Sequence, residues 1–306
     1  MYEESLGLEK RFSPLKRYIN SHRLWLRAIL AHRLWSRILR YRSICSSCNM
    51  GAAMIGSGLK YECLLFDMDD TLYPLSAGLN SACRQKIQEY MVHHLNIEET
   101  EVPKMCLDLY REHGTTMAGL KALGYDFDYD EFHAHVHGTL PYENLTPDPL
   151  LRSLLLSMPQ RKVVFTNADK AHAATVLSKL GLEDCFEGVI CFETLNPPQP
   201  ADEKTESARS MILCKPSPEA IEAAIRIANV DPSKTIFFDD SARNIMAGKA
   251  AGLHTVIVGS CAVVAGADYA LSSIHNIKEA IPEIWEEQAP AEQVISSATV
   301  QTPVVA

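Results

Sequence analysis

Three carboxylates within four residues follow a short apolar run early in this chain. Residues 61–66 have the apolar character of a buried strand, and Asp67, Asp69 and Asp70 come directly after it. Parallel sheets bind ligands at the carboxyl ends of their strands, so this is a typical place for a site. Carboxylates so close together repel one another unless a cation or a shared proton holds them. The alternative is a strand that ends in a solvated acidic turn, so the interpretation depends on partners elsewhere in the chain.

Three later segments bring polar groups to matching positions. They are Thr166 and Asn167 at the end of a predicted strand, Lys215 at the start of a helix, and Asp239 and Asp240 at the end of another strand, with Asn244 one helical turn further on. Because the ends of parallel strands share one edge of a sheet, this edge would gather at least four carboxylates, an ammonium group and hydroxyl and amide groups. So many carboxylates need a divalent cation, and a set of oxygen ligands selects Mg²⁺. The constellation predicts phosphoryl transfer, in which positioning and charge neutralisation supply most of the catalysis.

The strands that must carry these groups alternate with helices after residue 148. Strand patterns cover 61–66, 162–166, 188–192, 235–239 and 254–258, with a short sixth near Tyr269, and helical patterns cover 150–156, 169–180, 217–229 and 241–250. Such alternation is typical of βαβ units. The sequence therefore predicts an α/β fold, a Rossmann-like parallel sheet with helices on both faces.

Between the first and second predicted strands the pattern is helical throughout. Apolar residues recur at helical spacing over 76–95, 99–112, 115–122 and 128–138. We therefore expect an all-helical insertion, and the domain plan that follows has four parts. These are a basic N-terminal extension at 1–58, disordered or partly helical, an α/β core made of 59–75 and 148–286, a helical domain at 76–147, and a disordered tail at 287–306. Within the core, residues 195–211 form a Pro-rich surface loop.

Charge divides the chain into a basic start and an acidic body. Residues 1–50 carry ten Lys and Arg against three Glu, so the rest of the chain has a net charge of about −16. An acidic body excludes nucleic acid as the main partner. The basic segment has the arginines and apolar residues of an amphipathic helix, which could touch an anionic membrane surface or direct the chain to an organelle. Early glutamates argue against targeting, and a disordered extension is the competing interpretation.

Cysteine usage and hydropathy indicate where such a protein would work. The nine cysteines are an odd number without paired spacing, which favours free thiols and a reducing compartment. The single CxxC, Cys45 to Cys48, has no second pair at zinc spacing, so we interpret it as incidental. No apolar run is long enough to span a bilayer, so integral membrane association is not expected. We predict a cytoplasmic protein, with the nucleus as a second compartment.

The four polar segments, in this order and spacing, resemble the haloacid dehalogenase superfamily of aspartate-nucleophile phosphatases over roughly residues 60–275. The resemblance implies that Asp67 is the nucleophile, which forms an aspartyl-phosphate, and also a Mg²⁺ ligand. It implies that Asp69 is the general acid and base, with its backbone carbonyl in the metal shell. The helical insertion corresponds to the lid that this superfamily calls a C1 cap.

The remaining motif residues take supporting roles in that resemblance. Thr166 and Asn167 would bind the phosphoryl oxygens, and Lys215 would offset the charge of the nucleophile and the phosphate. Asp240 matches the direct metal ligand of the last motif, with Asp239 as a second ligand. Asn244 matches a supporting position near the phosphate in some members.

Within the superfamily, the motifs are most similar to the pyrimidine 5′-nucleotidases of fungi and plants. The similar stretches are Phe-Asp-Met-Asp-Asp-Thr-Leu-Tyr from Phe66, Phe-Thr-Asn-Ala-Asp from Phe165, Phe-Phe-Asp-Asp-Ser from Phe237, and two cap segments that start at Tyr110 and His137. This implies hydrolysis of a small phosphate ester, a nucleoside 5′-monophosphate such as UMP or CMP. The sequence specifies neither the base nor the oligomeric state.

Several alternatives stay open or are disfavoured. Another small phosphometabolite (a sugar phosphate, nicotinamide mononucleotide or lysophosphatidate) would use the same motifs, and a phosphomutase would keep both Asp67 and Asp69. A dehalogenase needs no acid at Asp69, and a non-enzymatic phospho-acceptor module needs neither Asp69 nor the long cap. His133, His135 and His137 alternate on one helix, so they cannot face one metal together, although His137 is a candidate for substrate contact.

Overall fold

The computed structural model describes residues 59–197 and 211–286. Three predicted segments lie outside the described residues: the N-terminal extension with its CxxC and basic helix, most of the Pro-rich loop, and the tail. Within the described ranges, no helix is both long enough and apolar enough to cross a membrane. The cysteines in these ranges are free thiols, as expected.

A six-stranded sheet forms the centre of the described chain. Its strands are β1 (Cys63–Phe66), β2 (Arg161–Phe165), β3 (Gly188–Ile190), β4 (Thr235–Asp239), β5 (His254–Val258) and β6 (Tyr269–Leu271). The order is β3-β2-β1-β4-β5-β6, and every neighbouring pair is parallel. The predicted fold class, a Rossmann-like α/β sheet, is confirmed. Because β1 lies between β2 and β4, the chain after β1 emerges beside the ends of both neighbours.

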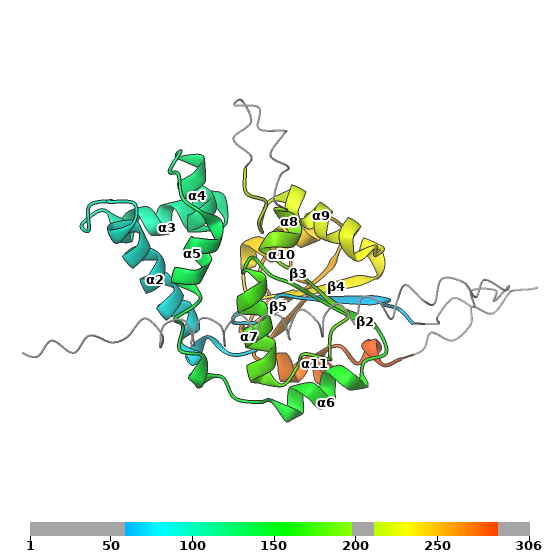
Figure 1. Cartoon of the computed structure of the whole chain (residues 1–306). Coiled ribbons are helices and arrows are strands. Elements are labelled where there is room, and N and C mark those ends of the chain that lie inside the picture. Colours follow the sequence, from blue (N-terminus) through cyan, green and yellow to red (C-terminus); the bar gives the residue numbers. More distant parts are fainter. Residues whose placement is uncertain (1–58, 198–210, 287–306) are drawn as a thin grey trace, which may run out of the picture. The chain divides into compact units, whose positions relative to one another are not determined.

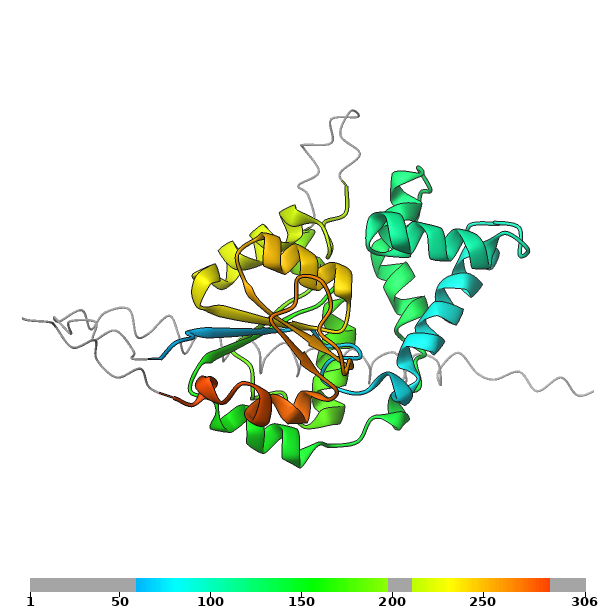
Figure 2. The same ribbon diagram turned by 180° about the vertical axis from the view of Figure 1, so that it is seen from behind.

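Helices cover both faces of this sheet (Figures 1 and 2). They are α6 (Pro149–Ser157), α7 (Lys170–Leu180), α8 (Phe192–Leu195), α9 (Pro218–Ala228), α10 (Ala242–Ala250) and α11 (Ile277–Ala280). Alternate residues of a strand point to opposite faces. Accordingly Leu64 and Phe66 pack with α6, α7 and α11 in one hydrophobic cluster, whereas Leu65 packs with α9 in a second cluster. Both faces of β1 are therefore buried, which fixes its position and register.

The segment between β1 and β2 is helical, as predicted. It contains η2 (Leu75–Ala77), α2 (Leu79–His93), α3 (Val102–His113), α4 (Thr116–Ala122), α5 (Tyr129–Val136) and η3 (Tyr142–Asn144). Helices α2 to α5 share a hydrophobic cluster of their own, to which the core contributes Phe192. These four packed helices lie within the stretch predicted as a helical domain, 76–147, which we call the cap below; its status as a separate domain stays a prediction.

Two short elements differ from the prediction. The strand predicted to reach Phe192 ends at Ile190, and α8 begins at Phe192. The N–H of Cys191 donates to the hydroxyl of Thr194 at 3.3 Å, so a side-chain cap starts a helix where apolar composition favoured a strand. Helix α11 was not predicted, because four residues are too short to show helical periodicity.

Gly248 of α10 gives a test of how tightly the helices pack on the sheet. A Cβ atom at this position would lie 2.7 Å from Cδ1 of Phe237, a fully buried side chain of β4. We expect Gly248→Ala to lower the free energy of unfolding by at least about 1 kcal/mol, because overpacking outweighs the better helix propensity of alanine. Urea denaturation measures this difference.

The matched control is Gly188→Ala in β3, where a Cβ would meet no atom within 4 Å. We expect it to change the stability by less than about 0.5 kcal/mol. Equal destabilisation by the two substitutions would show that the α10 packing described here is wrong.

Candidate active site

Lys215 joins the ends of three strands. Its Nζ lies 2.6 Å from Oδ1 of Asp67, which follows β1, and 2.8 Å from Oδ2 of Asp239, which ends β4. It also donates to the carbonyl of Phe165 in β2 at 2.8 Å. The Lys215 side chain is 1% exposed. All three donors of the ammonium are thus used inside the protein, as a buried cation requires.

Asn167 holds the backbone that carries this lysine. Its Oδ1 accepts from the N–H of Lys215 at 2.8 Å, and its Nδ2 donates to the carbonyl of Lys215 at 3.0 Å. The amide side chain predicted to bind phosphate is therefore engaged with Lys215. Thr166, the other predicted phosphate ligand, is buried, and its Oγ1 accepts from the N–H of Ala168 at 3.0 Å. Its hydroxyl hydrogen is left for another acceptor.

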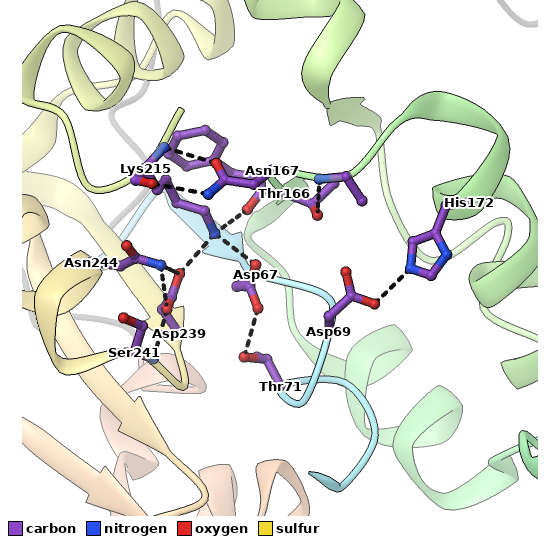
Figure 3. A network of polar contacts seen from close by, with 12 residues as sticks. Asp67, Asp69, Thr71, Thr166, Asn167, His172, Lys215, Asp239, Ser241 and Asn244 are labelled. Atoms are coloured by element: carbon purple, nitrogen blue, oxygen red, sulfur yellow. Dashed lines mark hydrogen bonds and ion pairs between the residues drawn. The ribbon is translucent and has the colours of Figure 1, made fainter. Parts of the chain in front are cut away.

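Asp239 and Asp67 are held by further donors (Figure 3). The oxygens of Asp239 accept from the N–H of Ser241 at 2.9 Å and from Nδ2 of Asn244 at 2.9 and 3.1 Å. Asn244, predicted to support phosphate binding, thus contacts Asp239. The second oxygen of Asp67 accepts from the hydroxyl of Thr71 at 3.0 Å. Each carboxylate is therefore fixed in orientation by groups on both of its sides.

The site has more negative charge than Lys215 can offset. Carboxylate oxygens of Asp67, Asp239 and Asp240 all lie within 4.8 Å of one another, the one such cluster of acidic, His or Cys ligands in the described ranges. Burial raises the pKa of Asp67 well above its usual range; Lys215 acts against this, and the nearby Asp239 adds to it. Three carboxylates against one ammonium leave an excess of negative charge. The residues present therefore fit a divalent cation with oxygen ligands.

Asp69 is turned away from this cluster (Figure 3). Its Oδ1 accepts from Nε2 of His172 at 2.7 Å and from the hydroxyl of Tyr73 at 2.5 Å. Burial alone would raise the pKa of Asp69, but the charge and hydrogen bond of His172, with Tyr73, lower it to about 2. In this arrangement Asp69 is a carboxylate. The two acids that the sequence placed two residues apart therefore have different surroundings.

The hydrogen bonds of His172 specify its protonation. The Tyr142 hydroxyl donates to the carbonyl of His137 at 3.0 Å and lies 2.7 Å from Nδ1 of His172. A hydroxyl has one hydrogen, so Nδ1 must donate to it, while Nε2 donates to Asp69. Both ring nitrogens then carry hydrogens. Burial would lower the pKa of His172, yet the neighbouring Asp69 and Asp169 raise it, in agreement with this assignment.

A pocket of about 430 Å³ adjoins Asp69. Helix α2 contributes one wall, and the lining includes Asp69, His172 and His137 together with apolar residues of α2 and α3. Asp67 is not part of the lining. The pocket therefore lies on the Asp69 side of the site, and His137, predicted as a candidate for substrate contact, does line it.

The three cap histidines do not converge on one point, as expected. His133 stacks on His137 with ring centroids 5.6 Å apart, and His137 contacts Asp169 through Nδ1. His135 instead packs against Tyr90 and His94, 5.4 and 5.0 Å away. His133 and His137 are four residues apart and lie on one face of the helix, whereas His135 between them points to another side.

Sequence reasoning missed three residues that contact Asp69 or its partner. They are His172, Tyr73 and Tyr142. His172 lies on the first turn of α7, five residues after Asn167, so a histidine just beyond the polar end of a strand was the available signal. Tyr142 lies in η3 at the end of the cap. It stands in the segment from His137 that resembles the nucleotidases, but nothing in the sequence assigns it a partner, because its contact exists only once the cap is folded.

Comparison with known proteins agrees with this geometry. The family model for haloacid dehalogenase-like hydrolases matches residues 61–252. The match covers more than half of the chain, and it contains each of the motif residues that meet at the sheet edge. This chain belongs to the haloacid dehalogenase-like hydrolase family.

Two curated relatives share part of their length with this chain. Phosphate metabolism protein 8 of Saccharomyces cerevisiae is 26% identical over 201 residues, which cover 63% of this chain and 60% of that protein. Phosphoglycolate phosphatase of Neisseria gonorrhoeae is 30% identical over 142 residues, 45% of this chain and 52% of that protein. The matched regions thus span 60% or less of these relatives.

Two solved structures of low sequence identity match about seven tenths of this chain. A haloacid dehalogenase-type phosphatase from Thermococcus onnurineus has a TM-score of 0.47 and 17% identity, with 71% of this chain and 96% of that one covered. An L-2-haloacid dehalogenase from Xanthobacter autotrophicus has a TM-score of 0.43 and 15% identity, with 72% and 97% covered. Membership of the family rests on the family model alone.

The buried lysine gives a stability test of the site. Lys215→Met would leave Asp67 and Asp239 without their shared cation in a buried place. We expect the free energy of unfolding to fall by about 3 kcal/mol or more, measured by urea denaturation.

Lys249→Met is the control, because Lys249 pairs with Asp268 at a partly exposed position. It should cost less than about 1 kcal/mol. A Lys215→Met protein as stable as the control would contradict the role of Lys215 as the cation that joins the strand ends.

Proposed function

We propose that this chain is a magnesium-dependent phosphomonoesterase that uses Asp67 as its nucleophile. One observation carries the proposal: two carboxylates two residues apart face different ways. Asp67 lies against Lys215 among the clustered acids, whereas Asp69 faces a pocket. A nucleophile and a proton-transfer group placed on opposite sides of a phosphate would need this arrangement.

The chemistry takes place in two steps. An oxygen of Asp67 attacks phosphorus, the bond between phosphorus and the ester oxygen breaks, and the departing alcohol takes a proton from Asp69. Water then attacks the phosphorus of the aspartyl-phosphate, gives a proton to Asp69, and frees Asp67 and inorganic phosphate. Because Asp69 is a carboxylate in the free protein, it must take up a proton once the phosphate ester is bound and before the first step, and it is ionised again for the second.

The remaining residues stabilise charge. Asp67, Asp240 and Asp239, with the backbone carbonyl of Asp69, would hold Mg²⁺, which supplies positive charge beside the phosphoryl oxygens when bound. Lys215 holds Asp67 and adds a further positive charge. Thr166 offers its hydroxyl and Asn167 its backbone N–H to the phosphate, because the Asn167 amide is already engaged. Asn244 acts by orienting Asp239.

For the substrate we propose a small phosphate ester, with UMP and CMP as the first candidates. The resemblance of the motifs to pyrimidine 5′-nucleotidases supports this, and a pocket of about 430 Å³ beside Asp69 accommodates a leaving group of nucleoside size. Sugar phosphates, nicotinamide mononucleotide and lysophosphatidate are the competing substrates. The relatives named above include a phosphoglycolate phosphatase, which supports phosphatase chemistry in general. The odd number of cysteines without paired spacing, and the free thiols among the described residues, support the cytoplasm as its compartment.

Release of inorganic phosphate tests the activity and the nucleophile together. We expect wild-type protein with Mg²⁺ to hydrolyse at least one ester in a panel of nucleoside monophosphates, sugar phosphates, nicotinamide mononucleotide and lysophosphatidate. Asp67→Asn should lower the rate by at least about 10³-fold, because an amide is a poor nucleophile. Asp231→Asn is the control, because Asp231 is exposed and belongs neither to the acidic cluster nor to the pocket lining. Wild-type rates in Asp67→Asn would exclude the mechanism, and transfer to a second sugar position without release would favour a mutase.

Thermal unfolding tests the metal site without any substrate. We expect MgCl₂ to raise the melting temperature of the wild type and EDTA to reverse the rise, since a ligand at 100 times its Kd adds about 2.7 kcal/mol. Asp240→Asn should reduce the Mg²⁺-dependent shift, whereas Asp231→Asn should keep it. Equal shifts in the wild type and Asp240→Asn would show that Asp240 does not hold the cation.

A further inference from the structure

Asp69 is held by a histidine that belongs to neither the predicted motifs nor the cap. His172 is 3% exposed, and its Nε2 lies 2.7 Å from Oδ1 of Asp69. Figure 3 shows the carboxylate of Asp69 pointing at this ring and away from Asp67. Both residues line the pocket, so the ring holds the carboxylate at the pocket wall. A leaving group in the pocket would meet Asp69 there.

We propose that His172 is a positioning residue that directs Asp69 toward the leaving-group oxygen. The inference rests on the proposed phosphomonoesterase activity and deepens it, because it assigns the orientation of the proton-transfer group to His172 and its supports. A carboxylate two bonds from the backbone has several rotamers. The hydrogen bond from His172 selects the one that faces the pocket.

The start of α7 fixes His172 in turn. Asp169 is the N-cap of this helix, and its Oδ2 accepts from the N–H of Ala171 at 3.0 Å and from the N–H of His172 at 3.2 Å. The other oxygen of Asp169 contacts Nδ1 of His137 at the end of α5. The buried carboxylate of Asp169 therefore holds both the backbone of His172 and the His137 side chain at the end of α5.

Tyr142 provides the second support. Its hydroxyl lies 2.7 Å from Nδ1 of His172 and donates to the carbonyl of His137. Tyr142 belongs to η3, where the chain returns from the cap to the core. The contacts run from the cap end through Tyr142 and His172 to Asp69. The orientation of Asp69 therefore depends on how the cap end lies against α7.

Two aryl phosphates of similar size separate positioning from general damage. Phenyl phosphate has a leaving group that needs a proton, whereas p-nitrophenolate leaves readily without one. The comparison uses the pre-steady-state rate at which the phenol is released in the first step, because the second step needs Asp69 with either ester. We expect His172→Leu to lower this rate for phenyl phosphate by about 10²-fold, the scale of a lost general acid, but for p-nitrophenyl phosphate by less than about 3-fold. The concentration of each ester that half-saturates the first step should change little. His172→Gln should recover part of the loss, because its amide can donate to Asp69.

The reference variant is Asp69→Asn, which should show the same split between the two substrates. His172→Leu added to Asp69→Asn should cause no further loss, since the two residues act as one unit. An equal loss on both substrates, or a full additional loss in the double variant, would mean that His172 has only a structural role.

Tyr142→Phe covers the case in which His172→Leu does not fold. It removes one hydroxyl and should give a smaller split in the same direction, about 3- to 10-fold on phenyl phosphate. Tyr269→Phe is its control, because this tyrosine donates to Glu283 at 2.7 Å in the core. No split in Tyr142→Phe would overturn the proposed support. Failure of the wild type to hydrolyse these two esters and every ester of the panel above would instead contradict the proposed function.

Discussion

The buried ammonium of Lys215 is the interaction on which the arrangement of this site depends. Strands β1 and β4 are parallel neighbours, with Phe66 opposite Phe238, so Asp67 and Asp239 leave the sheet side by side. Two carboxylates at adjacent strand ends would repel each other in the interior. Lys215 lies between them, and its third hydrogen bond reaches β2. The Lys215 side chain therefore offsets the repulsion between the aspartates at the ends of β1 and β4.

The single charge of Lys215 also explains why the site keeps an excess of negative charge that a cation could bind. If Lys215 neutralised every carboxylate, the sheet edge would be a stable ion pair and nothing more. Asp240 adds a further carboxylate to the pair, and it is exposed. The excess is a cost in the free protein, because burial raises the pKa of Asp67 and the like charges of Asp239 and Asp240 raise it further, against the effect of Lys215. A cation or a ligand that removes this cost gains affinity, which is a common way for a site to exchange stability for function.

The sequence predicted the parts of this structure that have local causes. Strands β4 and β5 lie at their predicted bounds, because each is a run of apolar and β-branched residues between turn or helix-start residues. The acids, Lys215 and Asn244 were found because parallel strand ends share an edge. What the sequence could not give is the partner of each group. Asn167 holds the Lys215 backbone, and His172 meets Asp69 from 103 residues away. Neither contact has a periodicity or spacing that a sequence shows.

The contacts of the cap with the core argue that access to the site and its geometry are linked. A Cβ on Gly114, which follows α3 and has φ of +88°, would lie 2.4 Å from the carbonyl oxygen of Lys215. Arg243, beside Asn244, donates to the carbonyls of Tyr110 and Arg111 at 3.2 and 2.8 Å. The end of α3 therefore lies against the backbone of Lys215, which holds Asp67, and against Arg243, the neighbour of Asn244. The end of α5 contacts Asp169, the residue that holds the backbone of His172. A movement of the cap would disturb both carboxylates that the proposed chemistry needs, so the proposed reaction would require the cap to be docked.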